Sequence, residues 1–235
     1  MTLDVITSPL LGGVRHGFFG RAGGASSGVF AGLNCGQGST DQAEAVVINR
    51  ARVAGAMGVA PSHLVGMHQV HSAEAVAVAA PAASRPRADG MATRTPGLAL
   101  SVLTADCQPI LLHDAEAGVV GAAHAGWRGT VAGVIEATVA AMEGLGARAS
   151  RVRAAIGPTI SQRAYEVGPE LMDEVLAEDP EAARFFAGGP GASQGDRMMF
   201  DLPGYGLLRL RRLGVEAEWT RHCTYSSPAR FFSYR

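Results

Sequence analysis

The chain has 235 residues, of which 47% are hydrophobic and 17% are charged, and its formal net charge is −1. This composition predicts a globular protein with a sizeable core and excludes a disordered chain. A chain with no basic surplus is not expected to bind nucleic acid. Since all 20 basic residues are arginine, a Schiff-base lysine and a Walker-type phosphate loop are excluded as well.

The N-terminal segment MTLDVITSPLLGG lacks the basic stretch and the apolar core of a signal peptide. No apolar run reaches the roughly 18–20 residues of a membrane span, so no membrane partner is expected. The three cysteines, Cys35, Cys107 and Cys223, are widely spaced and odd in number. A disulfide framework is therefore not expected, and the cytoplasm is the predicted compartment. The sequence leaves the oligomeric state open.

The predicted elements follow one another without the change of composition that is typical of an interdomain linker, so we expect a single domain over residues 1–235. The Gly- and Ser-rich segment 20–39 is predicted as a loop. A helix over 42–57 follows, with Asp41 as its N-cap and Glu44 three residues later, as in a capping box. A strand over 74–79 precedes a Pro- and Arg-rich loop over 79–93.

Three apolar runs then predict strands over 98–104, 109–114 and 118–125. Their connections have only a few residues, which suits antiparallel hairpins rather than the long crossovers that parallel strands need. The rest of the chain predicts helices over 130–143, 169–178 and 205–214, strands over 152–157, 215–219 and 230–235, and a loop insertion over 187–196. We therefore expect an α/β (α+β) fold with a mixed sheet.

Three short motifs combine metal-binding or nucleophilic residue types at the ends of apolar runs, where catalytic groups usually emerge from a sheet. They are MHQVHS (67–72) with His68 and His71, TADCQP with Cys107, and AAHAGWRG with His124. A cysteine and two histidines suit zinc, and three protein ligands leave the open coordination position of a catalytic site. If the first motif is extended, His68 and His71 point to opposite faces, so at most one of them belongs to the site.

The spacing of these motifs leaves alternatives open. The gaps of 36 residues from His71 to Cys107 and of 17 residues from Cys107 to His124 match no short zinc-finger pattern. Cys107 is equally compatible with a buried small hydrophobic residue or with a nucleophile. Arg128 follows His124 at the predicted start of a helix, and an arginine beside a helix N-terminus indicates an anionic partner.

Six motifs in chain order resemble the YfiH/DUF152 family: MHQVHS, ADGMAT, LTADCQPILL, AAHAGWRGT, AIGPTISQRAYEVGPE and FFSYR. That family has carried the labels laccase-domain polyphenol oxidase, purine nucleoside phosphorylase and peptidoglycan editing factor. The resemblance implies a layered helix–mixed sheet–mixed sheet–helix sandwich, similar to bacterial deamidating toxins that use a Cys–His pair. It also implies a metal site, usually with zinc, at His71, Cys107 and His124, and a substrate pocket lined by Arg21 and Asn34.

The function that the resemblance implies is that of a zinc-dependent purine nucleoside enzyme. It would carry out phosphorolysis of adenosine, inosine or methylthioadenosine and would also deaminate adenosine, with purine nucleosides and phosphate as its small-molecule partners. In deamination, zinc would activate a water molecule for attack on the purine, and Asp106 or His68 would carry the proton. His68 is also expected to contact substrate. Arg128, with Arg21 as the second choice, would contact phosphate.

Other functions stay open beside this one. Cys107 as a nucleophile with His124 as its base would make a cysteine hydrolase or amidase that acts on peptidoglycan precursors. A copper polyphenol oxidase is disfavoured, because a multicopper oxidase needs a His₂Cys copper site and a separate trinuclear cluster, whereas the chain has 7 scattered histidines. Copper nevertheless remains an alternative to zinc at the single three-residue site. A binding module without catalysis is the last alternative.

Overall fold

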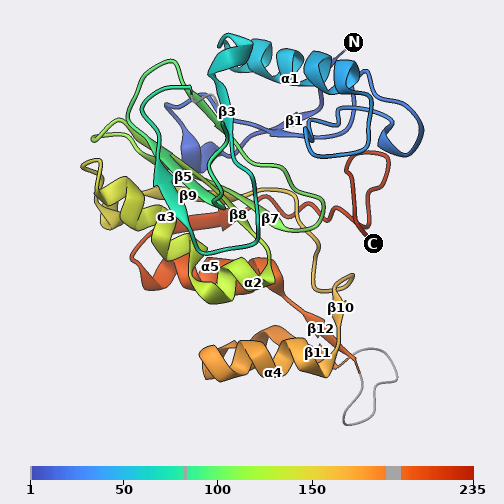
Figure 1. The fold of residues 1–235 in the computed structure, drawn as a ribbon. Coiled ribbons are helices and arrows are strands. Elements are labelled where there is room, and N and C mark those ends of the chain that lie inside the picture. The colour runs from blue at the N-terminus through green and yellow to red at the C-terminus, as the bar shows by residue number, and fades with distance from the viewer. Residues whose placement is uncertain (1, 82–83, 189–196) are drawn as a thin grey trace.

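The computed structural model describes residues 2–81, 84–188 and 197–235 and places helices on both sides of several sheets (Figure 1). The α-helices in these ranges are α1 (Ala43–Met57), α2 (Trp127–Ala132), α3 (Val134–Glu143), α4 (Pro169–Glu178) and α5 (Leu202–Arg212). The strands are β1 (Val5–Ile6), β2 (Phe18–Phe19), β3 (Leu64–Gly66), β4 (Ala75–Ala77), β5 (Gly90–Thr93), β6 (Ala99–Ser101), β7 (Gln108–Asp114), β8 (Val119–Ala125), β9 (Arg153–Ile156), β10 (Glu166–Val167), β11 (Phe186–Gly188), β12 (Met198–Phe200) and β13 (Glu216–Trp219).

A six-stranded mixed sheet forms the centre, in the order β13-β9-β7-β8-β5-β4. β7 pairs antiparallel with both β8 and β9, whereas β13–β9 and β4–β5 are parallel pairs. The tight β7–β8 turn forms at Asp114, whose carboxylate accepts hydrogen bonds from the backbone N–H groups of Glu116 and Ala117. The predicted mixed sheet and its hairpin over residues 109–125 are therefore confirmed.

Helices and a second sheet complete the layers around the central sheet. α3 and α5 cover one of its faces, where Met142 and Leu210 are buried with strand residues such as Ile110. On the other side, β3 and β6 form a parallel pair that packs on the central sheet around Met91, and α1 packs on this pair through Val53. Figure 1 shows α1 at the top and α3 and α5 below the sheet. The helix–sheet–sheet–helix order that the resemblance implied is present.

The helix predicted over 130–143 is two helices, α2 and α3, which are separated at Gly133. This glycine has a φ of 101°, in the left-handed region that side chains rarely adopt. Its backbone N–H closes α2 by donating to the carbonyls of Gly129 and Thr130. Because α2 begins directly after β8, the turn between them lies next to His124 near the end of that strand.

Two predicted helix boundaries differ from the structure because side-chain contacts decide them. α1 has Gln42 as its N-cap residue, and the Asp41 carboxylate instead accepts a hydrogen bond from the Asn34 amide. The predicted Asp41 cap is therefore wrong. α5 begins three residues earlier than predicted, because the Asp201 carboxylate accepts the backbone N–H of Gly204 and caps the helix.

One loop prediction, one strand-pairing prediction and one strand prediction were wrong. The segment 79–93, expected as a loop, contains β5, which lies between β8 and β4. β6 pairs with β3 in parallel and makes no hairpin with β7. The segment 230–235, expected as a closing strand, is irregular and bonds to Asp106. Of the expected loop over 187–196, residues 189–196 lie outside the described residues.

A small antiparallel sheet, β10-β12-β11, is absent from the predicted elements. It packs with α4 and α5 around a cluster of its own that contains Val175, Phe200 and Tyr205. No helix in the described ranges is both long enough and apolar enough to cross a bilayer. The single domain over 1–235 stays a prediction.

Candidate metal centre

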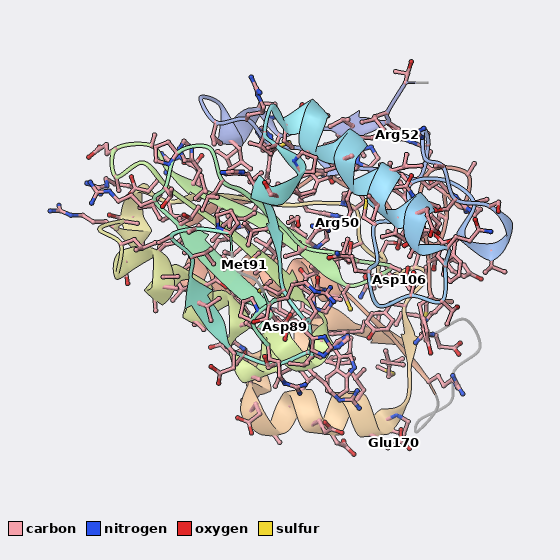
Figure 2. All side chains as sticks on the ribbon, turned by 45° about the horizontal axis from the view of Figure 1, so that its top comes forward. Arg50, Arg52, Asp89, Met91, Asp106 and Glu170 are labelled. Atoms are coloured by element: carbon pink, nitrogen blue, oxygen red, sulfur yellow. The ribbon has the colours of Figure 1, made fainter. Side chains whose placement is uncertain are left out.

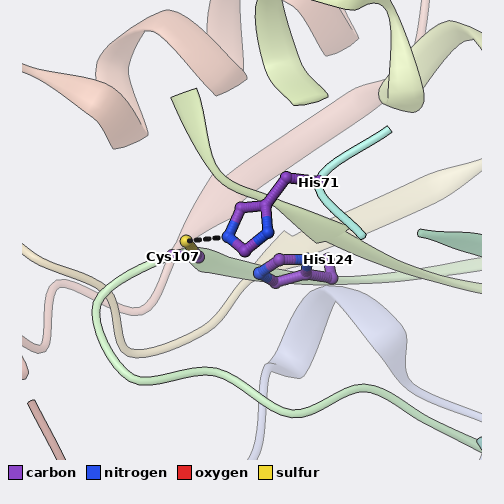
Figure 3. Close-up of side chains that lie close together, drawn as sticks. All are labelled: His71, Cys107 and His124. Carbon is purple, nitrogen blue, oxygen red and sulfur yellow. Dashed lines mark hydrogen bonds between the residues drawn. The ribbon is translucent and has the colours of Figure 1, made fainter. Parts of the chain in front are cut away.

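His71, Cys107 and His124 meet at one edge of the central sheet (Figure 3). Their ligand atoms all lie within 4.8 Å of one another, and the Cys107 Sγ is 3.9 Å from the His71 Nε2. The rings of His71 and His124 stand edge to face, with centroids 4.7 Å apart. Within the described part of the chain, this is the one group of three or more His, Cys, Asp or Glu side chains that could hold a metal ion.

Strand pairing explains why residues so far apart in the chain are neighbours. In the antiparallel β7–β8 pair, Pro109 lies opposite His124, and Cys107 stands two residues before Pro109. His71 belongs to the loop between β3 and β4. That loop reaches the same edge because β4 pairs with β5, and β5 pairs with β8. The three motifs found in the sequence therefore converge.

Asp89 holds two of the three residues in place, and the sequence alone did not single it out. Asp89 is fully buried. Its Oδ1 accepts hydrogen bonds from the His124 Nδ1 at 2.8 Å and from the His71 backbone N–H at 3.1 Å. Its Oδ2 accepts the Ser72 backbone N–H at 2.7 Å, the Ser72 hydroxyl at 2.8 Å and the Val70 backbone N–H at 3.1 Å. Because Asp89 takes the Nδ1–H, the Nε2 of His124 is left to bind a metal.

The backbone is in the left-handed region in both loops that lead to the cluster. His71 has a φ of 59°, and Asp106, which precedes Cys107, has a φ of 92°. Such conformations persist in residues other than glycine only where surrounding contacts fix them. The Asp89 hydrogen bonds fix the His71 loop, so a separate set of contacts must hold the Cys107 loop.

That second set of contacts comes from the C-terminal segment. The Asp106 carboxylate accepts hydrogen bonds from the Thr224 hydroxyl at 2.6 Å, from the Ser233 hydroxyl at 2.8 Å and from the Tyr234 backbone N–H at 2.8 Å. Both carboxylate oxygens are thus engaged in holding this segment against the Cys107 loop. The proton-carrier role of Asp106 stays a prediction, but these contacts favour an anchoring role.

The electrostatics of the cluster favour one positive charge. Burial lowers the pKa of His124, but hydrogen bonding to Asp89 and Cys107 outweighs burial and raises that pKa to about 9. Burial and the neighbouring His124 lower the pKa of His71. Burial alone would raise the pKa of Asp89, yet its hydrogen bonds hold it well below its usual range, so Asp89 is a carboxylate. A thiol, two imidazoles and a buried carboxylate behind one of them fit a bound metal cation.

A close backbone approach at Gly126 gives a test of the cluster. A Cβ at this position would lie 2.8 Å from the Cys107 Sγ and 3.1 Å from the His71 Cδ2. We therefore expect Gly126→Ala to push two ligands apart and to weaken zinc binding about tenfold or more. Zinc affinity would be measured by competition with a chromophoric chelator.

Gly55→Ala is the matched control for Gly126→Ala. Gly55 lies in α1, and a Cβ there would have no atom within 4 Å. Alanine in a helix is expected to raise the free energy of unfolding by about 0.5–1 kcal/mol and to leave zinc affinity unchanged. Equal zinc affinity in the two variants would contradict the arrangement of ligands described above.

The cluster opens into a cavity of about 1630 Å³, which all three residues line. Tyr165 lines the same cavity, and burial raises the pKa of its phenol to about 12, so the phenol is neutral at physiological pH. Arg128 is exposed, lines the cavity and stacks on Trp127, with its guanidinium carbon 4.5 Å from the ring centroid. The expected position of Arg128 beside the site is therefore observed, whereas its contact with an anion stays a prediction.

The other expected substrate residues have structural partners or lie elsewhere. Arg21 lines the cavity, but its guanidinium donates to the backbone carbonyls of Ala31 and Pro228. The Asn34 amide also lines the cavity and donates to Ser39 and Asp41, so it organises its own loop. These bonds favour structural roles for Arg21 and Asn34.

His68 is exposed and is not among the residues that line the cavity. Its backbone N–H instead donates to the carbonyl of Pro86, and its own carbonyl accepts the N–H of Ala88. The prediction that at most one of His68 and His71 belongs to the site agrees with this placement. The structure therefore does not favour the expected contact between His68 and substrate.

Known proteins resemble this chain over nearly its whole length. A profile of the family described as multi-copper polyphenol oxidoreductase laccase matches residues 15–235. A Deinococcus radiodurans protein named purine nucleoside phosphorylase is 42% identical over 237 residues, which cover 99% of this chain and 87% of that protein. A Streptomyces griseus protein, also named purine nucleoside phosphorylase, is 41% identical over 233 residues, which cover 97% and 92% of the two chains.

Solved structures give the same result for the fold. A Neisseria meningitidis protein assigned to DUF152 has a TM-score of 0.89 and 35% identity, over 99% of this chain and 92% of that one. YlmD from Geobacillus stearothermophilus has a TM-score of 0.86 and 30% identity, over 97% of this chain and 88% of that one. The expected YfiH/DUF152 fold is therefore confirmed.

Proposed function

This chain belongs to the multi-copper polyphenol oxidoreductase laccase family, and we propose that it is a zinc-dependent purine nucleoside phosphorylase that also deaminates adenosine. Relatives that are 42% and 41% identical to it are named purine nucleoside phosphorylases. Adenosine, inosine and methylthioadenosine are the proposed nucleosides. The observation that carries the proposal is the His71–Cys107–His124 cluster in the wall of a cavity of about 1630 Å³. The three free cysteines suit a reducing compartment, so we also propose a cytoplasmic location.

The residues at the cluster fit zinc. His71, Cys107 and His124 would hold the ion, and three protein donors are the number that a catalytic zinc site uses. Bound zinc would supply a Lewis acid with one open coordination position. Asp89 keeps His124 in the tautomer that binds through Nε2. Copper suits the same donors and is the alternative metal.

In phosphorolysis, this chain must also hold phosphate and assist the departure of the purine. A phosphate oxygen bonds to C1′ of the ribose, and the C1′–N9 bond breaks with its electron pair passing to the purine, which then takes up a proton. Arg128 at the cavity would hold a phosphate through paired hydrogen bonds. Tyr165 offers a neutral phenol in the same cavity, which could donate a hydrogen bond to the departing purine.

The laccase activity in the family's description is not what we propose. A multicopper oxidase needs a trinuclear cluster in addition to a His₂Cys site. In residues 2–81, 84–188 and 197–235, one group of suitable side chains comes together, and it contains three residues. A single site of this kind does not store the four electrons that reduce dioxygen to water.

A cysteine hydrolase or amidase acting on peptidoglycan precursors is the second candidate, and one observation favours it. Asp89 orients His124 through Nδ1, and Cys107 lies beside His124. An acid, a histidine and a cysteine in this order can activate a thiolate nucleophile. This mechanism gives His71 no task, whereas a zinc site needs it as a ligand.

One set of measurements separates the two candidates. Purified protein is assayed by chromatography with adenosine and phosphate, before and after treatment with chelator, and again after zinc is restored. We expect one zinc per chain, loss of turnover in chelator and its return with zinc. We also expect His71→Ala to remove zinc and turnover together. Iodoacetamide should label Cys107 quickly only in the chelated protein, because metal shields a thiolate.

The hydrolase makes the opposite prediction at each step. Its hydrolysis of a peptidoglycan precursor would survive chelator, would tolerate His71→Ala, and would be lost on treatment with iodoacetamide whether or not zinc is present. Any of these three results, in protein whose thermal unfolding is unchanged, would overturn the metalloenzyme.

A further inference from the structure

The cavity at the candidate metal centre is strongly cationic. The arginines that line it are Arg15, Arg21, Arg50, Arg94, Arg128 and Arg235. Asp106 is the sole carboxylate among the described lining residues, and the C-terminal segment occupies both of its oxygens. A concave surface with charge of one sign attracts the opposite charge. The cavity is thus built for an anionic ligand.

Arg50 differs from the other arginines of this cavity. Arg15, Arg94, Arg128 and Arg235 are exposed, so water solvates their charges. Arg21 is half-buried, but its guanidinium is satisfied by backbone carbonyls. Arg50 is half-buried as well, and among the described residues its side chain makes one hydrogen bond, from Nη2 to the Leu64 carbonyl at 2.9 Å.

Arg50 has no countercharge among the described residues. No carboxylate there lies within ion-pair distance of it, although nine such pairs form elsewhere. The acidic group that faces it is the Cys35 thiol, whose pKa burial raises to about 11, so that thiol is neutral at physiological pH. Burial lowers the pKa of Arg50, Cys35 partly offsets this lowering, and the positive charge of Arg85 adds to it. A half-buried charge without a partner is unfavourable unless a ligand supplies one.

We propose that Arg50 anchors a subsite for a phosphoryl group inside the cavity, separate from the exposed Arg128. The fork of N–H groups on a guanidinium matches two oxygens of a phosphate, and most of the donors on Arg50 have no partner in the described part of the chain. The choice of phosphate rests on the proposed phosphorolysis, which consumes it. The group belongs either to inorganic phosphate or to the 5′-phosphate of a purine nucleotide.

Arg52 provides a matched control on the same helix. Figure 2 shows Arg50 on the side of α1 that faces the sheet and Arg52 on the opposite side. The Arg52 guanidinium donates to the Gly23 carbonyl at 2.7 Å, and it is not among the residues that line the cavity. The same substitution at the two positions therefore changes net charge equally but affects the proposed subsite only at Arg50.

The test is direct titration of the full chain with inorganic phosphate by calorimetry, after chelator has removed metal. We expect Arg50→Gln to weaken phosphate binding about tenfold or more, since hydrogen bonds to a charged group are lost. Arg50→Lys keeps the charge but loses the fork of N–H groups, so its phosphate affinity should lie between those of the parent and of Arg50→Gln. The phosphate affinity of Arg52→Gln should stay within about twofold of the parent's. Phosphate is titrated without nucleoside, so no turnover occurs, and failure of the proposed phosphorylase activity leaves this result readable.

Adenosine 5′-monophosphate is titrated in parallel to identify the source of the phosphoryl group. Arg50-dependent binding of inorganic phosphate assigns the subsite to the co-substrate. Binding of the nucleotide alone, again dependent on Arg50, assigns it to a phosphorylated nucleoside. If Arg50→Gln binds both probes as tightly as the parent does, or if the parent binds neither, the proposal is wrong.

A second measurement covers the case in which Arg50→Gln does not fold. Phenylglyoxal modifies accessible arginines, and mass spectrometry follows each site in the unmutated protein. Saturating phosphate should slow the modification of Arg50 about fivefold or more, as expected for a ligand that occupies the guanidinium. Arg52 should react at the same rate with and without phosphate. An Arg50 rate that phosphate leaves unchanged would also overturn the subsite.

Discussion

Replacing Cys107 by serine is expected to weaken zinc binding at least about 100-fold and to abolish the turnover of adenosine with phosphate. A serine hydroxyl is a poor zinc ligand at neutral pH, so the cluster loses its sulfur donor and retains two histidines. Removing a group that only supports a ligand already costs about 10–100-fold in metal affinity, so removing a ligand costs more. Chelator competition measures the first effect, and chromatography measures the second.

Cys223→Ser is the control for this substitution. The Cys223 sulfur accepts hydrogen bonds from Ser161 and Ser226 and takes no part in the metal cluster. The Cys223→Ser substitution should therefore change zinc affinity and turnover by no more than about twofold. The zinc measurement is the decisive one, because a cysteine hydrolase would also lose activity without Cys107. Undiminished zinc binding by Cys107→Ser would refute the metal site.

Replacing Asp89 by asparagine is expected to weaken zinc binding about 10–100-fold although no ligand is touched. Asparagine fits in neither orientation. If its oxygen faces His124, its NH₂ group confronts the donors of Ser72 and Val70 that Oδ2 accepted. If it is flipped, the NH₂ group donates to the His124 Nδ1 and forces the ring proton onto Nε2, the atom that must bind metal.

Two measurements separate this positioning effect from simple loss of stability. Nitrogen chemical shifts of the histidine rings report whether the His124 proton has moved to Nε2 in folded Asp89→Asn protein. Ser72→Ala removes a single donor to Asp89 and leaves His124 alone, so it should lower stability by about 1 kcal/mol and keep zinc affinity within about twofold. A metal affinity unaffected by Asp89→Asn would show that His124 needs no such support.

Local patterns place candidate metal ligands in three motifs, and the resemblance to the YfiH/DUF152 family selects His71, Cys107 and His124 among them. Each follows or ends an apolar run, and their residue types share one chemistry, so strand ends with metal-binding side chains can be predicted before any contact is known. The β7–β8 hairpin is equally local, since its short connection dictates antiparallel pairing. The positions of Cys107 and His124 follow from that pairing.

Residue roles that depend on distant contacts are missed by sequence analysis, because local patterns do not show which segments meet in the fold. Asp89 lies in a segment that reads as loop, and its task exists only because His124, 35 residues away, and the His71 loop come to it in the fold. From the sequence, Arg50 is one arginine of the helix predicted over 42–57, and only the structure shows that it lines the cavity. Arg21 and Asn34 show the opposite case: the family resemblance implies that they line a substrate pocket, but nearby groups occupy their donors. These groups are the Ala31 carbonyl for Arg21 and the Asp41 carboxylate for Asn34.

The bonds between Asp106 and the C-terminal segment also set an order of events during synthesis. His71, Cys107 and His124 leave the ribosome long before Ser233, which is 127 residues beyond Asp106. A nascent chain can close its β7–β8 hairpin early, but the carboxylate of the left-handed Asp106 gains its hydrogen-bond donors only when Thr224, Ser233 and Tyr234 arrive. Because N-terminal parts of a chain are made and fold first, the Cys107 loop is among the last parts to become rigid. Assembly of the candidate metal centre is thus tied to the synthesis of residues 224–234.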